Sequence, residues 1–332
     1  MSKLSQSPVK TVNHAKGGPN APSTFLGLFK LKLNSTAQEL GRKQFVKLYF
    51  ILPCILFSFI MGTFPLIFMV YLAFNSWQPG SGGITWVGFR NFENMLHDLR
   101  FLEALFHTVL IVVAAVMVEL VLGTIVALFL QMRTWGDRWF RTIIVLPILL
   151  TPIALAYSWR MMFDYSHGPV NYFLGLAGVA PLQWLGNARM GMVSIVLVDV
   201  WQWTPFVALF LLAALESQDV ELYDAARVDG ANLTDMYRLI VLPLLGPFLF
   251  AMAMLRSIDT IKLFDTIYVL TGGGPGNSTE SITLYNYVAN FRTFNMGYMS
   301  AISVVLVIIV TIIFSFFMRG MSRVSQIATE EM

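Results

Sequence analysis

Hydrophobic residues are gathered along the chain in six long runs, separated by polar segments. Each run carries at most two charged side chains. About 20 consecutive apolar residues in a helix are enough to cross a bilayer core of roughly 30 Å. The pattern therefore predicts an all-helical polytopic membrane protein with six transmembrane helices. The six runs are Leu48–Phe74, Thr108–Leu130, Thr142–Trp159, Met190–Leu215, Leu242–Ile261 and Tyr298–Met318.

The composition of the 332 residues excludes a soluble protein. Hydrophobic residues make up 56% of the chain and charged residues only 12%, whereas about a quarter of a soluble domain is charged. The net charge of +3 reflects cations that border membrane spans, so we expect no nucleic-acid partner. A single cysteine, Cys54, and four scattered histidines outside any H-E-x-x-H pattern predict neither a metal site nor a catalytic centre.

The lysines and arginines predict how the chain is oriented. Fifteen of them lie in the tails and loops on the side of the two termini, and five lie on the opposite side. Because cytoplasmic loops carry the excess of positive charge, both termini are predicted to lie in the cytoplasm.

The chain divides by composition into three parts. Residues 1–44 are rich in Ser, Pro, Asn, Lys and Gly, which predicts a cytoplasmic, disordered tail. Residues 45–319 hold the six predicted helices together with a cytoplasmic loop at 216–242. Residues 320–332 form a short cytoplasmic C-terminal tail.

The cytoplasmic loop at 216–242 predicts two short helices joined at a bend. The first runs through Leu222–Val228 and ends near Gly230, a residue that tolerates positive φ at a helix terminus. The second begins with Asn232 as its cap. The small side chains at this bend leave room for another protein to approach closely; the alternative is a compact turn that has no partner. These small residues are Ala225, Ala226, Gly230 and Ala231.

The order of residues in this loop resembles a known motif. Asp224-Ala225-Ala226, Gly230, Ile240 and Leu242-Pro243 match the spacing of the EAA motif, which marks the permease subunits of binding-protein-dependent ABC importers. Asp224 stands where that family usually has Glu. Asp keeps the negative charge, but its side chain has a shorter reach. The resemblance implies that the bend couples to an ATPase through the following residues: Asp224, Ala225, Ala226, Asp229, Gly230 and Ala231.

Two further segments resemble the carbohydrate-type members of that family, such as the maltose, glycerol-phosphate and multiple-sugar permeases. They are Phe264–Thr279, with its run Gly272-Gly273-Gly274-Pro275-Gly276, and Trp86–Phe92. The resemblance covers about residues 47–319. It implies a fold like that of type I ABC importer permeases, in a bacterial inner membrane and surrounded by lipid. It also implies a second homologous permease, two cytoplasmic ATPase subunits that hold ATP and Mg, an external solute-binding protein and a sugar-like solute.

Charged side chains recur every three residues at the end of the fifth run. They are Arg256, Asp259, Lys262 and Asp265, and residues three apart are neighbours on a helix surface. Charges at membrane depth are costly and normally face a cavity or each other. We interpret this stripe as the polar lining of a sugar path; the alternative is a salt-bridge ladder that fastens the helix to a neighbour, and both can hold.

The fourth run is interrupted by Asp199, Gln202 and Trp203, followed by Pro205. An indole offers a sugar ring an apolar face, and Asp or Gln offers directional hydrogen bonds. These residues are predicted to line the path, although Trp203 could instead anchor the helix at the membrane interface. Glu119, in the second run, is expected to pair with a neighbouring helix and not to contact solute.

The chain has no G-x-x-x-x-G-K-[ST] phosphate loop, so it is not itself the ATP-hydrolysing component. A rival hypothesis is a stand-alone ion-coupled secondary transporter in which Asp199, Asp259 and Lys262 relay protons or ions. That hypothesis predicts inverted repeats, and the sequence contains no visible repeat. A membrane-embedded hydrolase would need a nucleophile and base within the spans, and no such pattern is present.

Overall fold

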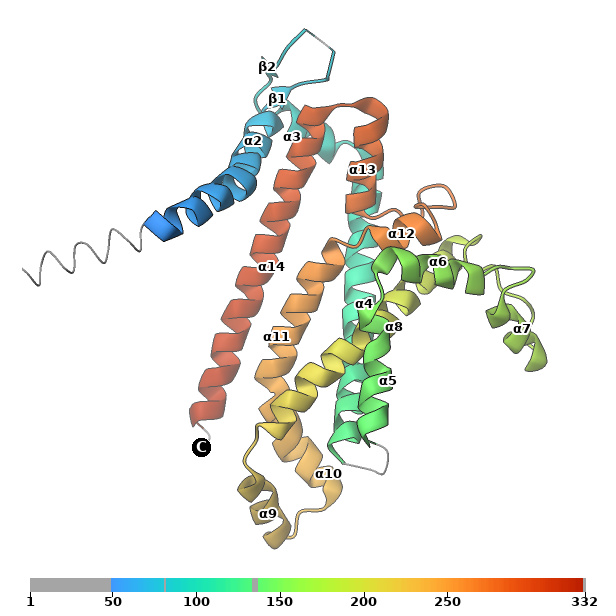
Figure 1. Ribbon diagram of the computed structural model, residues 1–332, viewed down its shortest axis with the longest axis vertical. Helices are drawn as coiled ribbons and strands as arrows, with labels where there is room; N and C mark the ends of the chain where they lie inside the picture. The colour runs from blue at the N-terminus through green and yellow to red at the C-terminus, as the bar shows by residue number, and fades with distance from the viewer. Residues whose placement is uncertain (1–48, 81, 133–136, 331–332) are drawn as a thin grey trace, which may run out of the picture. The chain divides into compact units, whose positions relative to one another are not determined.

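The computed structural model describes residues 49–80, 82–132 and 137–330, and these residues are mainly helical (Figure 1). The tail predicted over residues 1–44 lies outside them. The described residues divide into two compact units, one that ends at Ile67 and one that begins at Phe68. In chain order the elements are η1 (Phe59–Thr63), α2 (Phe64–Ala73), β1 (Asn75–Ser76), β2 (Thr85–Trp86), α3 (Arg90–Leu96), α4 (Leu99–Gln131), α5 (Asp137–Leu149), α6 (Pro152–Met162), α7 (Pro169–Leu176), α8 (Ala188–Glu216), α9 (Val220–Val228), α10 (Leu233–Asp235), η2 (Met236–Val241), α11 (Leu242–Ile261), α12 (Asp265–Leu270), α13 (Ile282–Thr293) and α14 (Met296–Glu330).

The helices account for the six predicted runs. Among the described residues, five helices are long and apolar enough to cross a membrane, and one bent pair of helices supplies a sixth crossing if it is taken as one span. The all-helical fold class is therefore confirmed. The five are Tyr49–Ala73, Leu99–Gln131, Ala188–Glu216, Met236–Ile261 and Met296–Gly320.

The third predicted run is a broken helix. Its two halves, α5 and α6, meet at an angle of 98°, with Pro147 near the end of α5 and Pro152 at the start of α6. A proline at the start of a helix leaves no amide hydrogen to continue the preceding one. The carbonyl of Leu150, freed by the break, accepts a hydrogen bond from Gln202 Nε2 at 3.3 Å. This contact supplies a partner that the break removes, as non-helical backbone at membrane depth requires.

Two π-turns precede prolines. η1 ends two residues before Pro65 in the first helix, and η2 ends two residues before Pro243 at the start of α11. The proline ring crowds the carbonyl four residues earlier, and prolines and π-turns are both common sites of helix bending. The residues directly after each π-turn, Phe64 and Leu242, keep helical φ and ψ, so the helix does not end there.

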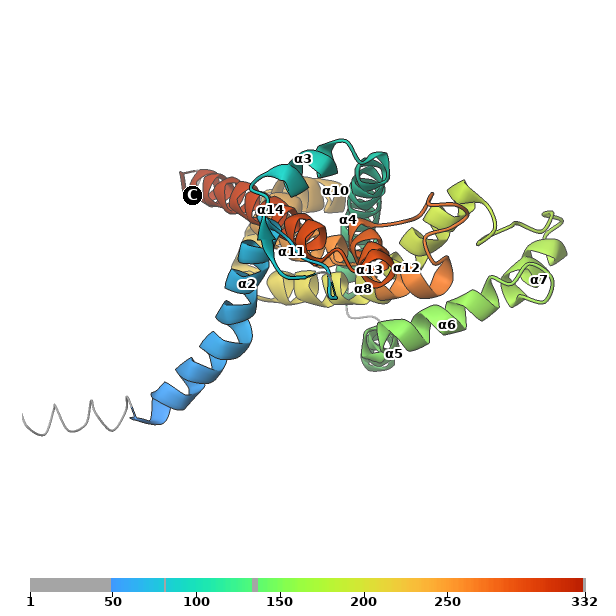
Figure 2. The ribbon, with the colours of Figure 1, turned by 90° about the horizontal axis from the view of Figure 1, so that it is seen from above.

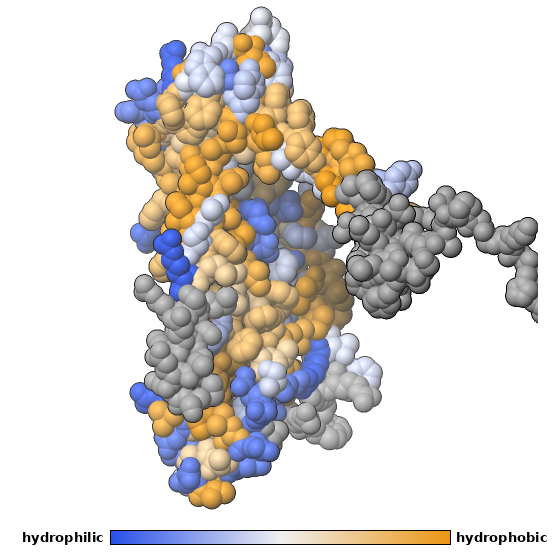
Figure 3. Space-filling model, turned by 90° about the vertical axis from the view of Figure 1, so that its left-hand side faces the viewer, coloured by the Kyte–Doolittle hydropathy of each residue, from blue (hydrophilic) through white to orange (hydrophobic). Residues whose placement is uncertain are grey.

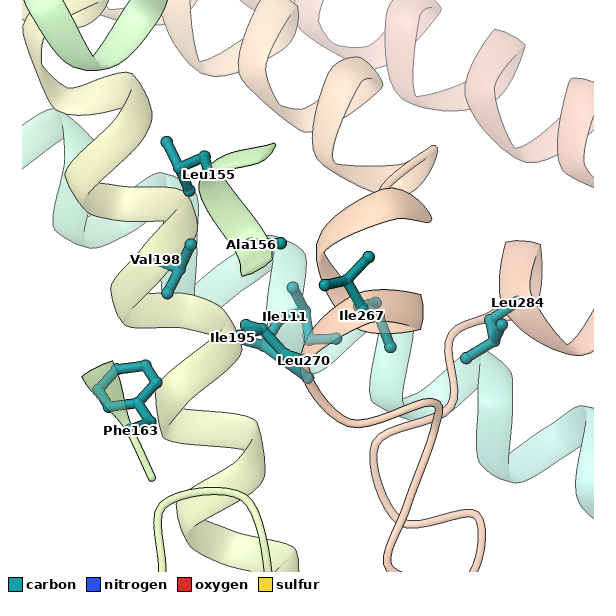
Figure 4. Close-up of a cluster of buried hydrophobic side chains, with 10 residues drawn as sticks. Ile111, Leu155, Ala156, Phe163, Ile195, Val198, Ile267, Leu270 and Leu284 are labelled. Carbon is teal, nitrogen blue, oxygen red and sulfur yellow. The ribbon is translucent and has the colours of Figure 1, made fainter. Parts of the chain in front are cut away.

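The core of the second unit is built where α4 and α8 cross. A Cβ added to Gly123 on α4 would lie 2.5 Å from Val207 Cγ1 on α8, so the two helices approach as closely as glycine permits. A second buried cluster gathers Ile111, Ile195, Ile267 and Leu270 from α4, α8 and α12 (Figure 4). These contacts hold α12, which follows the fifth span, against the ends of the membrane helices.

The segment after the fifth span is fastened to the second span by polar contacts. Arg100, in the first turn of α4, binds Glu280 with two hydrogen bonds of 2.8 Å each. Asp98 caps α4 and accepts hydrogen bonds from the hydroxyls of Tyr285 and Tyr298. Helix α13 stands beside the upper part of α14 and packs against α4 and α14 (Figure 1). Seen from above, α13 and α12 lie between α14 and α6 (Figure 2).

Candidate functional site

A buried arginine connects two membrane-spanning helices. Arg256 on α11 donates from Nε to Glu119 Oε2 at 2.7 Å and from Nη2 to Glu119 Oε1 at 3.0 Å. Glu119 lies on α4, and its side chain is fully buried. Two parallel hydrogen bonds between a guanidinium and a carboxylate form a strong and directional pair. The expectation that Glu119 pairs with a neighbouring helix is thereby confirmed.

Two more carboxylates complete the surroundings of Arg256. Its Nη2 donates to Asp199 Oδ2 on α8 at 3.0 Å, and its Nη1 donates to Asp259 Oδ2 on α11 at 3.2 Å. Lys262 Nζ lies 3.6 Å from Asp259 Oδ1. Arg256 and Asp199 are buried, whereas Asp259 is 49% exposed. The ion cluster therefore joins α4, α8 and α11 and reaches the surface at Asp259.

A cavity of about 230 Å³ opens beside this ion cluster. All seven residues that the sequence assigns to a solute path line it, although they come from three different elements. The wall also contains residues that sequence reasoning did not single out. The predicted residues on the wall are Asp199, Gln202, Trp203, Arg256, Asp259, Lys262 and Asp265; the others are Pro152, Thr260, Leu263 and Thr266.

Trp203 and Gln202 each have a structural contact as well as a place on the wall. The Arg256 guanidinium carbon lies 4.6 Å above the centre of the Trp203 ring, a cation–π contact. Gln202 is buried and donates to the carbonyl of Leu150 at the break between α5 and α6. The fourth span therefore contributes both to the cavity wall and to the support of the broken third span.

Of the four charged residues predicted to lie along one helix, only Arg256 and Asp259 lie on α11. Helix α11 ends at Ile261, Lys262 caps it, and Asp265 begins α12. Asp259 contacts both Arg256 and Lys262, as expected for residues three apart on a helix. The remaining contacts of Arg256 cross to other helices. The ion pairs of the salt-bridge alternative are therefore present, and the same residues also line a cavity.

A larger cavity, of about 1240 Å³, is lined by α4, α5 and α8. Its wall is almost wholly apolar; examples are Leu110, Val118, Ile143 and Val196. Such a wall offers few hydrogen-bonding groups to a polar solute. The smaller cavity beside Arg256 is therefore the better candidate for a solute site.

The predicted bend in the loop at 216–242 is present. Helix α9 ends at Val228, Gly230 follows with φ of +81°, and Asn232 Oδ1 accepts from the amide of Asp235 at 3.0 Å. A Cβ placed on Gly230 would meet no atom within 4 Å, so open space surrounds the turn. Asp224 pairs with Arg227 at 2.9 Å on the exposed side of α9. The prediction of two short helices joined at a glycine is confirmed.

The bend lies at one end of the second unit. Helices α9 and α10 lie at the lower end of the view, beyond the long helices (Figure 1). Hydrophobic residues cover much of one face, and hydrophilic residues gather at the same lower end (Figure 3). Val228, at the end of α9, is 87% exposed. The end of α9 beside the turn is therefore open to solvent.

Comparisons with known proteins agree with this picture. Residues 119–324 match the family model described as "Binding-protein-dependent transport system inner membrane component". The chain is 37% identical to the trehalose/maltose transport system permease protein MalF of Thermococcus litoralis, over 82% of this chain and 90% of that protein. It is 28% identical to the multiple sugar-binding transport system permease protein MsmF of Streptococcus mutans, over 81% of this chain and 92% of that protein.

A solved structure shows the same fold. A chain of a bacterial ABC transporter involved in the import of the acidic polysaccharide alginate superimposes with a TM-score of 0.76, at 20% sequence identity. The match covers 87% of this chain and 99% of that one. At this identity the likeness establishes the fold alone.

Proposed function

The chain belongs to the family of binding-protein-dependent transport system inner membrane components, and we propose that it passes a sugar or sugar-like solute through the cavity beside Arg256. Within that family it is the permease subunit of an ABC importer. Family membership favours this function over a stand-alone ion-coupled transporter. The relatives named for trehalose, maltose and multiple sugars support a carbohydrate solute.

The observation that carries the proposal is the convergence of the seven predicted residues on one cavity. Asp259 and Asp265 offer carboxylate oxygens that accept hydrogen bonds from hydroxyl groups, and Lys262 offers a donor. The half-buried indole of Trp203 gives an apolar surface beside them. Dense hydroxyl groups on an otherwise apolar ring call for this combination of donors, acceptors and aromatic surface.

The bend around Gly230 is the proposed contact with the ATPase. The chain lacks a phosphate loop, so ATP and Mg are held by partner subunits, and hydrolysis there drives the permease. The open space at Gly230 and the exposed Val228 suit insertion into a partner's cleft. Asp224, Ala225, Ala226, Asp229, Gly230 and Ala231 form the contact. Transport then follows from an equilibrium between inward-open and outward-open states, which ATP and the loaded binding protein bias from opposite sides.

The complete importer contains one further homologous permease, two ATPase subunits and an external solute-binding protein. Both termini and the bend lie in the cytoplasm, because the lysines and arginines favour that side. The segment that contains α12 and α13 then faces the exterior, where the binding protein docks.

The proposal is tested by purifying the tagged chain from its native membrane and identifying by mass spectrometry what accompanies it. The expected result is an ATPase, a second permease and a sugar retained by an attached binding protein. A lone chain or homodimer that transports solute without ATP would overturn the proposal.

Asp259→Asn, which removes a charge from the half-exposed edge of the ion cluster, is expected to impair uptake in the intact complex while preserving assembly.

A further inference from the structure

The hydrogen-bonding capacity of Arg256 is almost wholly taken up by carboxylates. A guanidinium has five N–H donors. Two hydrogen bonds go to Glu119, one goes to Asp199 and one goes to Asp259. We refer to these three carboxylates as the acidic shell of Arg256. The arginine is therefore on the cavity wall but is already neutralised by protein groups, so it has little to offer an incoming anion.

The charges on the wall also favour one sign. Asp199, Asp259 and Asp265 oppose the two cations Arg256 and Lys262, which leaves one formal negative charge in excess. Glu119 does not line the cavity, but it binds Arg256 from behind and takes up two of its donors. Charges in a partly buried site are weakly screened. A solute that enters the cavity therefore meets a net negative field.

We propose that the acidic shell makes this path selective for uncharged polyhydroxyl solutes and against anionic ones such as uronates and sugar phosphates. The inference rests on the proposed sugar path and specifies the class of sugar. To reach Arg256 an anion would have to displace a carboxylate, and at Lys262 it would lie beside Asp259, which already pairs with that lysine. Such repulsion is an effective source of specificity. An uncharged sugar, in contrast, donates its hydroxyl hydrogens to the free lone pairs of Asp259 and Asp265.

Glu119 is the positioning residue of this arrangement. It does not itself line the cavity, and it acts through the two hydrogen bonds that hold Arg256 against α4. Its replacement by Gln keeps the shape of the side chain but replaces one acceptor oxygen with an amide donor, so one of the two hydrogen bonds from Arg256 is lost. The Arg256 guanidinium is then less neutralised and can attract an anionic solute.

The test uses the complete importer, purified with the subunits that accompany the tagged chain and reconstituted in nanodiscs without binding protein. Binding is measured by calorimetry for matched pairs that share one sugar skeleton, trehalose with trehalose 6-phosphate and maltose with maltose 6′-phosphate. The wild type is expected to bind the uncharged member at least about tenfold more tightly. In Glu119→Gln this preference falls by about tenfold or more, whereas Glu119→Asp, which keeps both acceptor oxygens, retains more of it.

Asp259→Asn is a second variant that keeps the test valid if a change at buried Glu119 prevents assembly. Asp259 is half exposed, so its amide is accommodated without burying a new unpaired charge, and the same shift toward the phosphorylated sugar is expected. Equal binding of both members of each pair by the wild type, or an unchanged preference in the assembled variants, would overturn the inference. Failure of the wild type to bind any of the four sugars would instead overturn the proposed sugar path itself.

Discussion

Arg100 at the start of α4 holds Glu280 through two parallel hydrogen bonds of 2.8 Å, although 180 positions separate them in the chain. Glu280 is almost completely buried, and Arg100 is 38% exposed. The pair fastens the segment between α12 and α13 to the second membrane span. It therefore holds in place the surface that we propose as the contact with a binding protein.

Replacing Glu280 by Ala should release that segment. The substitution leaves Arg100 without its carboxylate, and hydrogen bonds to charged groups contribute about 1.5–3 kcal/mol each at most. Thermal unfolding of the importer in nanodiscs should shift to lower temperature by the equivalent of about 1–3 kcal/mol. Arg100→Lys, which keeps the charge but loses the two-pronged geometry, should cost less. An unchanged unfolding temperature in Glu280→Ala would show that the pair does not stabilise the segment.

Asp98 should make the same region sensitive to strong acid. Partial burial opposes ionisation of this carboxyl, but hydrogen bonds from Tyr285, Tyr298 and the amides of Phe101 and Arg100 outweigh it and lower the pKa of Asp98 below its usual 3.8. A lowered pKa in the folded state stabilises the protein above the unfolded value, and this contribution disappears as the pH falls through the folded value.

Tyr285 makes the stability of the same region depend on pH in the alkaline range. Burial, with the hydrogen bond to Asp98 as a second cause, raises the pKa of Tyr285 to about 12 from its usual 10.0. Its stabilisation is therefore complete below pH 10.0 and is lost as the pH rises through about 12. Both effects are measured by comparing the unfolding temperatures of wild type and Asp98→Asn. The difference between them should be constant from pH 3.8 to pH 10.0 and should shrink below pH 3.8. A difference that stays the same in acid would contradict this assignment.

Gly123 should not tolerate a side chain. A Cβ at this position would lie 2.5 Å from Val207 Cγ1 and 2.8 Å from Val207 Cβ, and overpacking of a core typically costs about 1–3 kcal/mol. Gly123→Ala should therefore lower the unfolding temperature, and the added change Val207→Ala should restore much of the loss. Gly175→Ala is the control, because a Cβ there meets nothing within 4 Å. Equal effects of the two glycine substitutions would contradict the close packing of α4 against α8.

Gly230→Glu should uncouple transport from ATP hydrolysis while the chain still inserts and assembles. The positive φ of +81° strains any residue with a Cβ, at about 1 kcal/mol, so Gly230→Ala measures the strain alone. The bulk and charge of Glu should add a much larger loss, because they occupy the space proposed for the ATPase. Solute-stimulated ATP hydrolysis in proteoliposomes is the readout. Normal coupling in Gly230→Glu would remove the proposed contact.

Cysteine labelling should establish the orientation. In a Cys54→Ser background, Ser278→Cys places a thiol on the exposed loop before α13, and Val228→Cys places one at the end of α9. A membrane-impermeant maleimide applied to intact spheroplasts should label Ser278→Cys, whereas Val228→Cys should react only after the membrane is opened. The reverse pattern would place the termini outside.

Features that depend on local composition and backbone chemistry could be predicted from the amino-acid sequence. The six membrane spans can be predicted because each one must be apolar along its own length. The bend at Gly230 can be predicted because a left-handed turn and an Asn cap depend on single residues. Even here the boundaries differ: the predicted run beginning at Thr108 belongs to a helix that begins at Leu99, because Asp98 caps it earlier.

The pairing of polar groups, in contrast, is seen in the folded protein and could not be predicted from local patterns. Glu119 and Arg256 are 137 positions apart in the chain. A single acidic residue in an apolar run indicates that a partner is required, but the sequence pattern does not identify that partner. The bend of 98° between α5 and α6 likewise became a definite geometry only through the packing that brings Gln202 to Leu150. Pairing across helices depends on the rotation and depth of each helix against its neighbours, and these are set by close contacts such as Gly123 against Val207, which no local pattern in the sequence contains.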